Sequence, residues 1–156
     1  MNIQKFSVIG ISTRTTNENE QSAKDIPALW NKFLSEGIQN KISNKVSDDI
    51  VCIYTDYEKD HTKPYTIILG CIVDNLDFIP DGFTGKTIEG NNYEKFTAKG
   101  NLADGIVINE WIKIWNSDLD RIFTSDFEIY GEKARTPENA EVDIFYCNQI
   151  INKKRS

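Results

Sequence analysis

A carboxylate set among aromatic residues in the run TSDFEIYGEK, residues 124–133, is the part of this sequence best suited to chemistry. The run is typical of a strand, in which Phe127 and Ile129 fall on one face and Glu128 and Tyr130 on the other. A carboxylate in an apolar pocket loses its hydration and tends to take up a proton. A bound cation offsets that loss, and an aromatic ring adds about 0.5–2 kcal/mol of cation–π attraction. The run therefore predicts a site for an aromatic cation selected by Glu128; the simpler alternative is a solvated strand face.

The elements that must position this strand occur twice along the chain. In each half, one strand is followed by an amphipathic helix and then by two further strands. The first half contains strands at 5–13, 49–57 and 64–74 and a helix at 26–36, with Asp25 as its cap. The second half contains strands at 93–100, 125–132 and 140–150 and a helix at 102–118. The segment between the halves contains one more short strand, at 85–90.

The last two strands of each half match when the first half is shifted by 76 residues. Ile53 then falls on Ile129, Tyr54 on Tyr130 and Cys71 on Cys147. A coincidence among apolar strands is the alternative, but a match without gaps across two strands and their loop favours a duplicated β-α-β-β unit. We therefore expect a single domain over residues 1–156, with a first repeat at about 3–75, a connector at about 76–91 and a second repeat at about 92–150.

Two such units predict an α+β fold, in which both helices cover the same face of one antiparallel sheet around a pseudo-twofold axis. We expect a ligand groove on the opposite face, at the seam between the halves, because ligands favour concave seams. Strand alternation then places Phe127 and Ile129 under the helices. The side chains expected in the groove are Glu128, Tyr130, Tyr54, Phe145, Glu141 and Asp143. The alternatives are cross-strand packing for the two tyrosines and solvated charge for Glu141 and Asp143.

The composition narrows the classes of partner and chemistry. The chain has 24 acidic and 18 basic residues, and this charge of −6 argues against DNA or an anionic membrane as a partner and attracts cations. The longest apolar run, residues 67–73, is much shorter than the ~20 residues of a membrane helix, and we expect a cytoplasmic protein. Three cysteines without metal-ligand spacing predict buried free thiols, and we expect no metal and no cofactor. The single histidine, His61, lies in a polar loop, which argues against a histidine-based triad.

Six motifs in order give the chain a resemblance to a known family: IPALWNKF, YTIILGCIV, YEKFTAKG, NEWIKIWNSD, DFEIYGEK and VDIFY. Over about residues 3–150, the chain resembles the GyrI-like, AraC-type effector-binding domains of bacteria, above all the stand-alone integron-associated effector-binding proteins. The resemblance implies a duplicated β-α-β-β fold and a receptor for drug-like, often cationic, aromatic compounds. It also implies that Glu128 is the central glutamate of the family, that Trp111 lies beside the pocket and that Tyr65 occupies a position where an aromatic residue is common.

Three functions follow, and we favour the first. As a binding module, the protein captures aromatic cations, either as a sink or as a sensor that reports to a regulatory protein not identified by the sequence. Direct DNA binding is not expected, because the helix-turn-helix domain that accompanies some relatives is not expected beside this one.

The second function is hydrolysis of electrophilic, cyclopropane-type compounds, which the resemblance implies for some stand-alone members. Glu128 would then be the general base, and Tyr65 or Tyr130 would orient the substrate or donate a proton. The third is inhibition of a DNA enzyme by an acidic, DNA-like surface, since some relatives are linked to gyrase.

Overall fold

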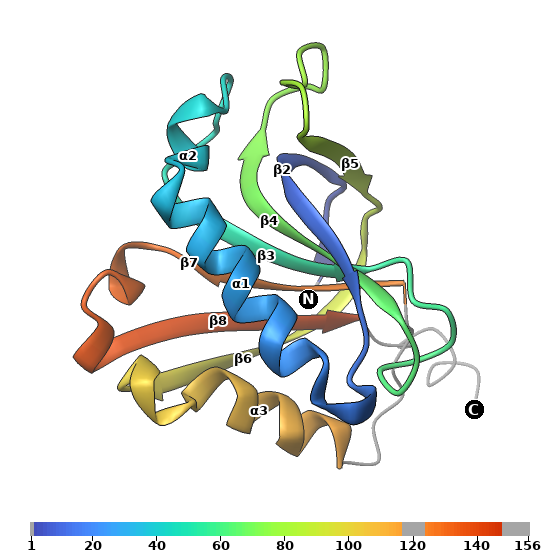
Figure 1. Ribbon diagram of the computed structural model, residues 1–156, viewed down its shortest axis with the longest axis vertical. Helices are drawn as coiled ribbons and strands as arrows, with labels where there is room; N and C mark the ends of the chain where they lie inside the picture. Colours follow the sequence, from blue (N-terminus) through green and yellow to red (C-terminus); the bar gives the residue numbers. More distant parts are fainter. Residues whose placement is uncertain (1, 117–123, 148–156) are drawn as a thin grey trace.

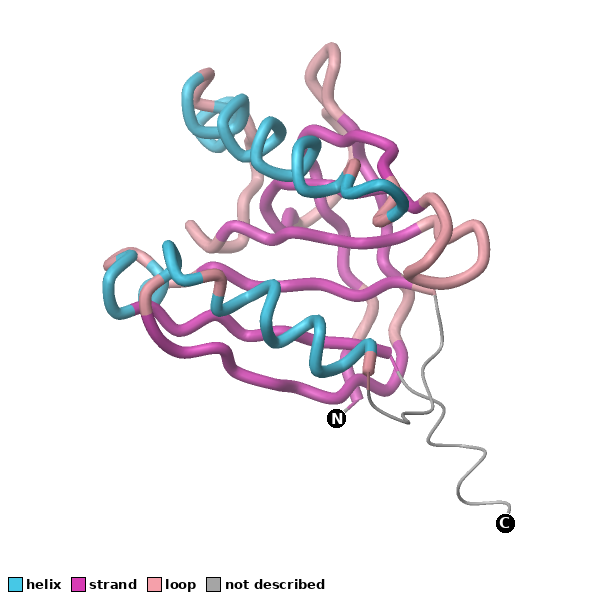
Figure 2. The backbone as a smooth tube through the Cα atoms, turned by 60° about the horizontal axis from the view of Figure 1, so that its bottom comes forward, coloured by secondary structure: helices cyan, strands magenta, loops and turns pink. Residues whose placement is uncertain are grey.

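The chain forms a curled antiparallel sheet with helices on one side, as seen in a computed structural model that describes residues 2–116 and 124–147 (Figure 1). The strands are β1 (Asn2–Ile3), β2 (Phe6–Thr15), β3 (Ile50–Thr55), β4 (Tyr65–Val73), β5 (Thr84–Ile88), β6 (Asn91–Gly100), β7 (Ser125–Tyr130) and β8 (Ala140–Cys147). The α-helices are α1 (Ser22–Ser35), α2 (Ile38–Lys41) and α3 (Ile106–Trp115). Short turns of 3₁₀ helix are η1 (Glu18–Glu20), η2 (Leu102–Asp104), η3 (Glu132–Ala134) and η4 (Pro137–Asn139). The predicted α+β fold, with both long helices on one face of the sheet, is confirmed (Figure 2).

The strand order is symmetrical about the centre of the sheet. It runs β1-β6-β8-β7-β3-β4-β2-β5, so that β2-β4-β3 of the first half mirrors β6-β8-β7 of the second. The halves join where β3 pairs antiparallel with β7, which places Cys52 opposite Glu128 and Tyr54 opposite Asp126. This order is the one expected of two β-α-β-β units joined edge to edge, while the boundaries of the domain and its repeats stay a prediction.

Amphipathic periodicity explains α1, which buries Leu29 and Phe33 against the sheet from positions four residues apart. The helix begins at Ser22, before Asp25, so the capping role predicted for Asp25 is wrong; this residue lies in the first turn. Gly37 takes a left-handed conformation with φ of 60° just after the helix ends, which glycine adopts without strain. The short helix α2 follows it, in a segment for which the sequence predicted no helix.

Each face of the sheet carries its own apolar core. The core under the helices contains Ile9, Ile11, Leu29, Phe33, Cys52, Tyr65, Ile67 and Leu69 around α1, and Trp111, Ile114, Val142, Ile144 and Tyr146 around α3. The core on the other face contains Val8, Val51, Ile53, Ile68, Ile88, Tyr93, Phe127, Phe145 and Cys147. On that face the ring of Phe127 stacks on Phe145 with centroids 4.7 Å apart and meets the edge of Tyr93 at 5.2 Å. The curl of the sheet thus buries a face that none of the described helices covers; we call it the helix-free face.

The predicted orientation of β7 and β3 is therefore wrong. Phe127 and Ile129 lie on the helix-free face, and Glu128 and Tyr130 lie under the helices. Alternation along β7 separates the two faces correctly. It does not reveal which face the helices cover, because both faces are apolar over most of their area. The groove at the seam must accordingly be sought between α1 and α3.

Two glycines allow β2 and β4 to approach closely where the sheet bends. Gly10 and Gly70 are direct partners in the antiparallel ladder. A Cβ on Gly10 would lie 2.1 Å from the carbonyl oxygen of Leu69, and one on Gly70 would lie 2.1 Å from that of Ile9. Because both obstacles are main-chain atoms, neither can move aside without separating the strands. This pair of glycines is a local requirement of the curled sheet.

Candidate functional site

Glu128 is a buried carboxylate held by three aromatic donors. Its side chain is 1% exposed. Tyr54 donates its hydroxyl to Oε2 at 2.7 Å, and the indole N–H of Trp111 donates to the same oxygen at 2.6 Å. Tyr130 donates its hydroxyl to the other oxygen, Oε1, at 2.6 Å. The three donors come from β3, α3 and β7, so the carboxylate joins both halves of the molecule.

Burial and hydrogen bonding act on Glu128 in opposite directions. Loss of hydration raises the pKa of the Glu128 carboxyl above its ordinary value, and the bonds from Tyr130, Tyr54 and Trp111 oppose that rise because they favour the charged form. Burial has the larger effect, so the pKa of Glu128 is raised overall. The same burial, with the charge of Glu128 nearby, raises the pKa values of Tyr54 and Tyr130 well above their ordinary value, which keeps both hydroxyls protonated as donors.

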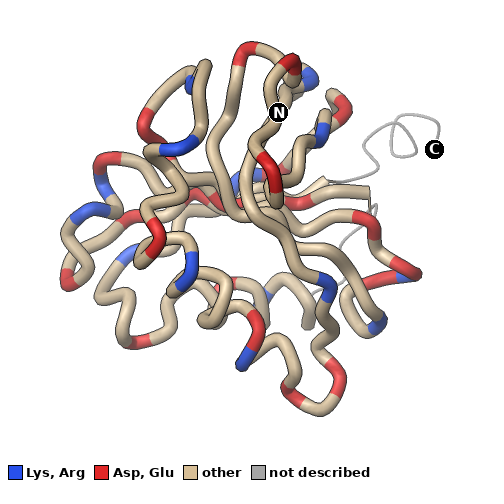
Figure 3. The backbone as a smooth tube through the Cα atoms, turned by 45° about the horizontal axis from the view of Figure 1, so that its top comes forward, with Lys and Arg blue, Asp and Glu red and all other residues tan. Residues whose placement is uncertain are grey.

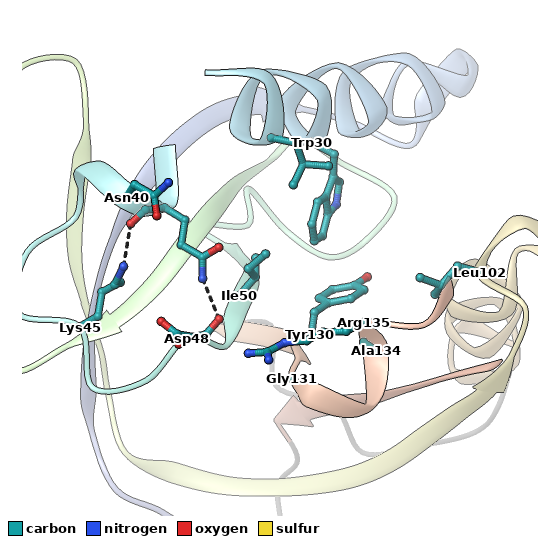
Figure 4. Close-up of a pocket in the computed structure, with 12 residues that line it drawn as sticks. Trp30, Asn40, Lys45, Asp48, Ile50, Leu102, Tyr130, Gly131, Ala134 and Arg135 are labelled. Carbon is teal, nitrogen blue, oxygen red and sulfur yellow. Dashed lines mark hydrogen bonds between the residues drawn. The ribbon is translucent and has the colours of Figure 1, made fainter. Parts of the chain in front are cut away.

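Two hollows lie on either side of this cluster, and α1 borders both. The small hollow has a volume of about 50 Å³ and is lined by Asn17, Ser22, Ile26, Tyr54, Tyr57, His61, Tyr65, Ile108, Trp111 and Trp115. The large hollow has a volume of about 670 Å³ and is lined by Trp30, Leu34, Gln39, Asn40, Lys45, Asp48, Ile50, Leu102, Tyr130, Gly131, Ala134 and Arg135 (Figure 4). Tyr54 and Trp111 border the small hollow and bind Oε2, whereas Tyr130 borders the large hollow and binds Oε1. Oε2 of Glu128 is therefore held by donors that line the small hollow, and Oε1 by the donor that lines the large hollow.

Ring contacts pack the walls of both hollows. The rings of Trp30 and Tyr130 meet edge to face with centroids 4.8 Å apart, and Figure 4 shows the two rings close together in the lining of the large hollow. In the small hollow, Tyr54 lies 5.5 Å from Trp111 and 6.0 Å from Tyr65, again between ring centroids. These contacts favour the observed positions of the donor rings, since aromatic pairs at such distances stabilise one another.

The structure brings together five of the eight side chains that the sequence predicted for ligand binding. Glu128, Trp111, Tyr54 and Tyr130 form the hydrogen-bonded cluster just described. Tyr65 is a fifth member of the same wall, and its hydroxyl donates to Oδ1 of Asn17 at 2.6 Å. Burial raises the pKa of the Tyr65 hydroxyl to about 12. Their role in ligand binding remains a prediction.

The predicted placement of the other three side chains beside Glu128 is wrong. Phe145 stacks on Phe127 on the helix-free face. Asp143 accepts a hydrogen bond from Thr97 at 2.9 Å and pairs with Lys95 at 3.7 Å, while Glu141 pairs with Lys99 at 3.8 Å. The reason is the register, because Glu128 faces Ile144 in the β7–β8 ladder and so shares its face with the even-numbered residues of β8.

Sequence reasoning missed four aromatic residues that line the two hollows: Trp30, Tyr57, His61 and Trp115. Trp30 and Trp115 also pack against the cores around α1 and α3. The sequence places His61 in a polar loop. His61 stacks on Trp115 with ring centroids 5.2 Å apart and an interplanar angle of 0° over the small hollow. Tyr57, from the same loop, donates its hydroxyl to Asp126. A single-sequence pattern contains no signal for a loop that folds back over a helix, and only the three-dimensional contact reveals it.

Asp126 is a second buried carboxylate on the strand and face of Glu128. It is fully buried, and it accepts the main-chain N–H of Cys147 at 3.0 Å as well as the Tyr57 hydroxyl. These two bonds tie β8 and the loop after β3 to β7. We assign Asp126 this structural role, because both bonds connect separate segments of the backbone to β7.

Other kinds of site find little support in the part of the chain that the structure describes. Over residues 2–116 and 124–147, no group of three or more His, Cys, Asp or Glu side chains is placed to hold a metal ion. Cys52, Cys71 and Cys147 are buried free thiols, as predicted. None of the helices described is long and apolar enough to cross a membrane. Acidic and basic residues are interspersed along the described part of the backbone, as Figure 3 shows.

Comparison with known proteins gives the family. Residues 2–147 match the family described as Cass2, the integron-associated effector binding proteins. The chain belongs to the Cass2 family. YobU of Bacillus subtilis (strain 168), named as a candidate transcriptional regulator protein, is 30% identical over 149 residues, which cover 93% of this chain and 92% of YobU. The resemblance read from the sequence is confirmed, and membership of the Cass2 family identifies the chain as an effector-binding protein, one that binds small molecules.

Solved structures share the fold of this Cass2-family chain. The integron cassette protein VCH_CASS2, from the mobile metagenome of Vibrio cholerae, is 27% identical with a TM-score of 0.73, over 96% of this chain and 94% of that protein. SAV2435, solved with tetraphenylphosphonium bound, has a TM-score of 0.81 at 16% identity, over 98% of this chain and 94% of SAV2435. The similarity to SAV2435 shows the shared fold.

Proposed function

We propose that this protein binds an aromatic organic cation between α1 and α3, with Glu128 as the countercharge. The observation that supports the proposal best is that all three hydrogen bonds to the buried carboxylate come from the neutral donors Tyr54, Trp111 and Tyr130. Neutral donors position a carboxylate without cancelling its charge, so the site still attracts a cation. The same rings offer stacking and cation–π surface to an aromatic ligand.

Entry is expected from the large hollow, because it is the one of the two hollows beside Glu128 that has a suitable size. Ligand pockets for drug-sized molecules measure roughly 300–1,000 Å³. The large hollow has about 670 Å³ and the small hollow about 50 Å³. Since Glu128 is 1% exposed, the ligand reaches its carboxylate only when a donor ring moves. We expect Tyr130 to move, because its ring borders the large hollow and its hydroxyl alone occupies Oε1.

The bound cation of SAV2435 supports the proposal at the level of the fold. Tetraphenylphosphonium is a bulky aromatic cation with its charge shielded by four rings. Such a cation loses little hydration on burial, and a carboxylate among aromatic side chains is a suitable partner for it.

Calorimetric titration with tetraphenylphosphonium and with neutral triphenylphosphine oxide tests the proposal. Glu128→Gln keeps the size of the side chain and removes its charge. We expect it to weaken binding of the cation by about tenfold or more, the effect of about 1.4 kcal/mol, and to leave binding of the oxide unchanged. Equal losses for both compounds would refute selection by charge.

Asp143→Asn is the matched control for the titration. It removes one carboxylate from the neighbouring strand and changes the net charge equally, but Asp143 lies on the helix-free side, paired with Lys95. Binding of the cation should be unchanged in this variant. A loss as large as that of Glu128→Gln would assign the effect to overall charge instead of to the site.

A further inference from the structure

The large hollow carries charged side chains that the small hollow lacks. Lys45, Asp48 and Arg135 line it together with the rings of Trp30 and Tyr130. Figure 4 shows Lys45 and Asp48 on the side of the hollow opposite Leu102. The small hollow is lined by aromatic, apolar and neutral polar side chains and by His61. The two hollows thus offer different chemistry to the two ends of a ligand.

Neither cation of the large hollow is neutralised within the described residues. Nζ of Lys45 donates to the main-chain oxygen of Gln39 at 3.0 Å, a bond that leaves its charge uncompensated. Arg135 is exposed and forms no ion pair or side-chain hydrogen bond over residues 2–116 and 124–147. Asp48, the one acid among the lining side chains, pairs with neither cation over the same residues. The lining therefore has two cations and one acid in a protein whose charge is −6.

Tyr130 connects these cations to Glu128. Its hydroxyl lies 2.6 Å from Glu128 Oε1 and its ring lines the large hollow. Arg135 follows Tyr130 after a glycine and the single turn η3. A ligand that displaces Tyr130 from Glu128 must therefore extend into the hollow that Lys45 and Arg135 border. An anionic group at that end of the ligand would meet the half-buried Lys45, where an ion pair is stronger than in water, and also the exposed Arg135.

We propose that the ligand is amphoteric: an aromatic cation that also carries a carboxylate, with the cationic ring system at Glu128 and the carboxylate at Lys45 and Arg135. The inference rests on the proposed function and specifies its ligand class. It also explains why a pocket for cations is bordered by two basic side chains, an arrangement that disfavours a ligand with positive charge alone.

Rhodamine 110 and rhodamine 123 form the probe pair, because they share a xanthene cation and differ in a free carboxylate against its methyl ester. Both dyes are titrated calorimetrically into the wild type and into the double variant Lys45→Gln with Arg135→Gln. The quantity measured is the Kd of the ester divided by the Kd of the acid. We expect this ratio to fall about fivefold in the double variant, as for the loss of two partly exposed ion pairs. In 0.5 M salt, which screens such pairs, the difference between the proteins should largely disappear.

The control is the double variant Lys41→Gln with Lys133→Gln. These lysines are exposed, lie near the same elements and line neither hollow, so the variant loses the same two charges elsewhere. An unchanged ratio in Lys45→Gln with Arg135→Gln, or an equal fall in the control, would overturn the amphoteric ligand. Rhodamine 123 would still bind in that case, and the proposed function would stand. If a folded wild type binds neither dye, both proposals fail.

Discussion

Glu128 is a carboxylate whose ionisation and ligand binding must be linked. Burial raises its pKa, and no cation neutralises it among the three partners that the structure gives it. A cation bound beside the carboxylate favours the charged form and lowers the pKa again. Binding of the ligand and loss of a proton are then two sides of one equilibrium, and each can be used to measure the other.

Cation binding should therefore release protons. Between the ordinary pKa of a glutamate and the raised pKa of Glu128, affinity for tetraphenylphosphonium should rise with pH, because the proton leaves as the ligand enters. Calorimetry in two buffers of different ionisation enthalpy measures the protons released. Glu128→Gln should give the same heat in both buffers. Uptake of protons by the wild type, or no exchange throughout this range, would contradict the raised pKa.

Stability should respond to pH in the opposite sense. In the same pH range the native state holds a proton that the unfolded state has lost, so the free energy of unfolding falls as pH rises through it. Glu128→Gln removes this titration, and its amide oxygen can accept from Tyr54 and Trp111 while its amide N–H donates to the hydroxyl oxygen of Tyr130. We expect the variant to be more stable than the wild type above this range and equal to it below, as measured by urea unfolding at each pH. A constant difference at all pH values would disprove this.

The site could be predicted in part from single residues. Glu128, Tyr54 and Tyr130 follow from alternation in two strands, and Trp111 and Tyr65 follow from the family resemblance. Phe145, Glu141 and Asp143 could not be placed relative to Glu128, because the pairing register of β7 with β8 is not encoded in either strand alone. The large hollow could not be predicted at all, since it depends on α2, η2 and η3, three short elements without a periodic pattern.

At the scale of elements, the close approach of β2 and β4 shapes the sheet under α1. Gly10→Ala places a methyl group 2.1 Å from the Leu69 carbonyl oxygen, and main-chain atoms cannot rotate away. We expect a loss of about 1–3 kcal/mol in the free energy of unfolding, the usual cost of overpacking, measured by urea titration.

Ser12→Ala, two residues along the same strand, is the control for this prediction. It removes only an exposed hydrogen bond of Ser12 to Thr84 and should cost about 1 kcal/mol or less. A Gly10→Ala protein as stable as the Ser12→Ala protein would show that the two strands can separate without cost.

The longer elements were predicted well and their mutual arrangement less well. Each of the strands predicted in the two repeats is present, and so are both helices, because runs of six or more residues with a clear period carry enough signal. The covered face was predicted wrongly, since β7 and β3 are apolar on both sides once the sheet curls. The core on the helix-free face depends on contacts between residues far apart in the sequence, such as Tyr93 with Phe127. A pattern within one segment does not reveal such contacts.

At the scale of the whole molecule, the pairing of β3 with β7 makes the two halves one sheet. Glu128 of the second half also binds Tyr54 of the first, and the aromatic core around Phe127 includes residues of both. If one half unfolds, the other therefore loses a strand partner and part of its apolar core. This arrangement predicts a single cooperative unit, as small domains usually are.

Urea unfolding should accordingly follow one transition for both halves. Far-UV circular dichroism and the NMR signals of the Trp30 and Trp111 indoles, which report on α1 and α3, should give the same midpoint and slope. Two separated midpoints would show that the repeats are independent units. Leu29→Ala in α1 should shift both probes equally, because the stability of the halves is shared.

The hydrogen bond from Trp111 to Glu128 has one practical consequence. An indole whose N–H points at a carboxylate from 2.6 Å emits light at a wavelength that depends on whether that carboxylate is charged. Protonation of Glu128, or binding of a cation beside it, changes the electric field at the Trp111 indole and therefore its emission wavelength. We therefore expect the emission of Trp111, seen against that of Trp30 and Trp115, to change when a ligand binds, which would allow ligands to be screened without a label.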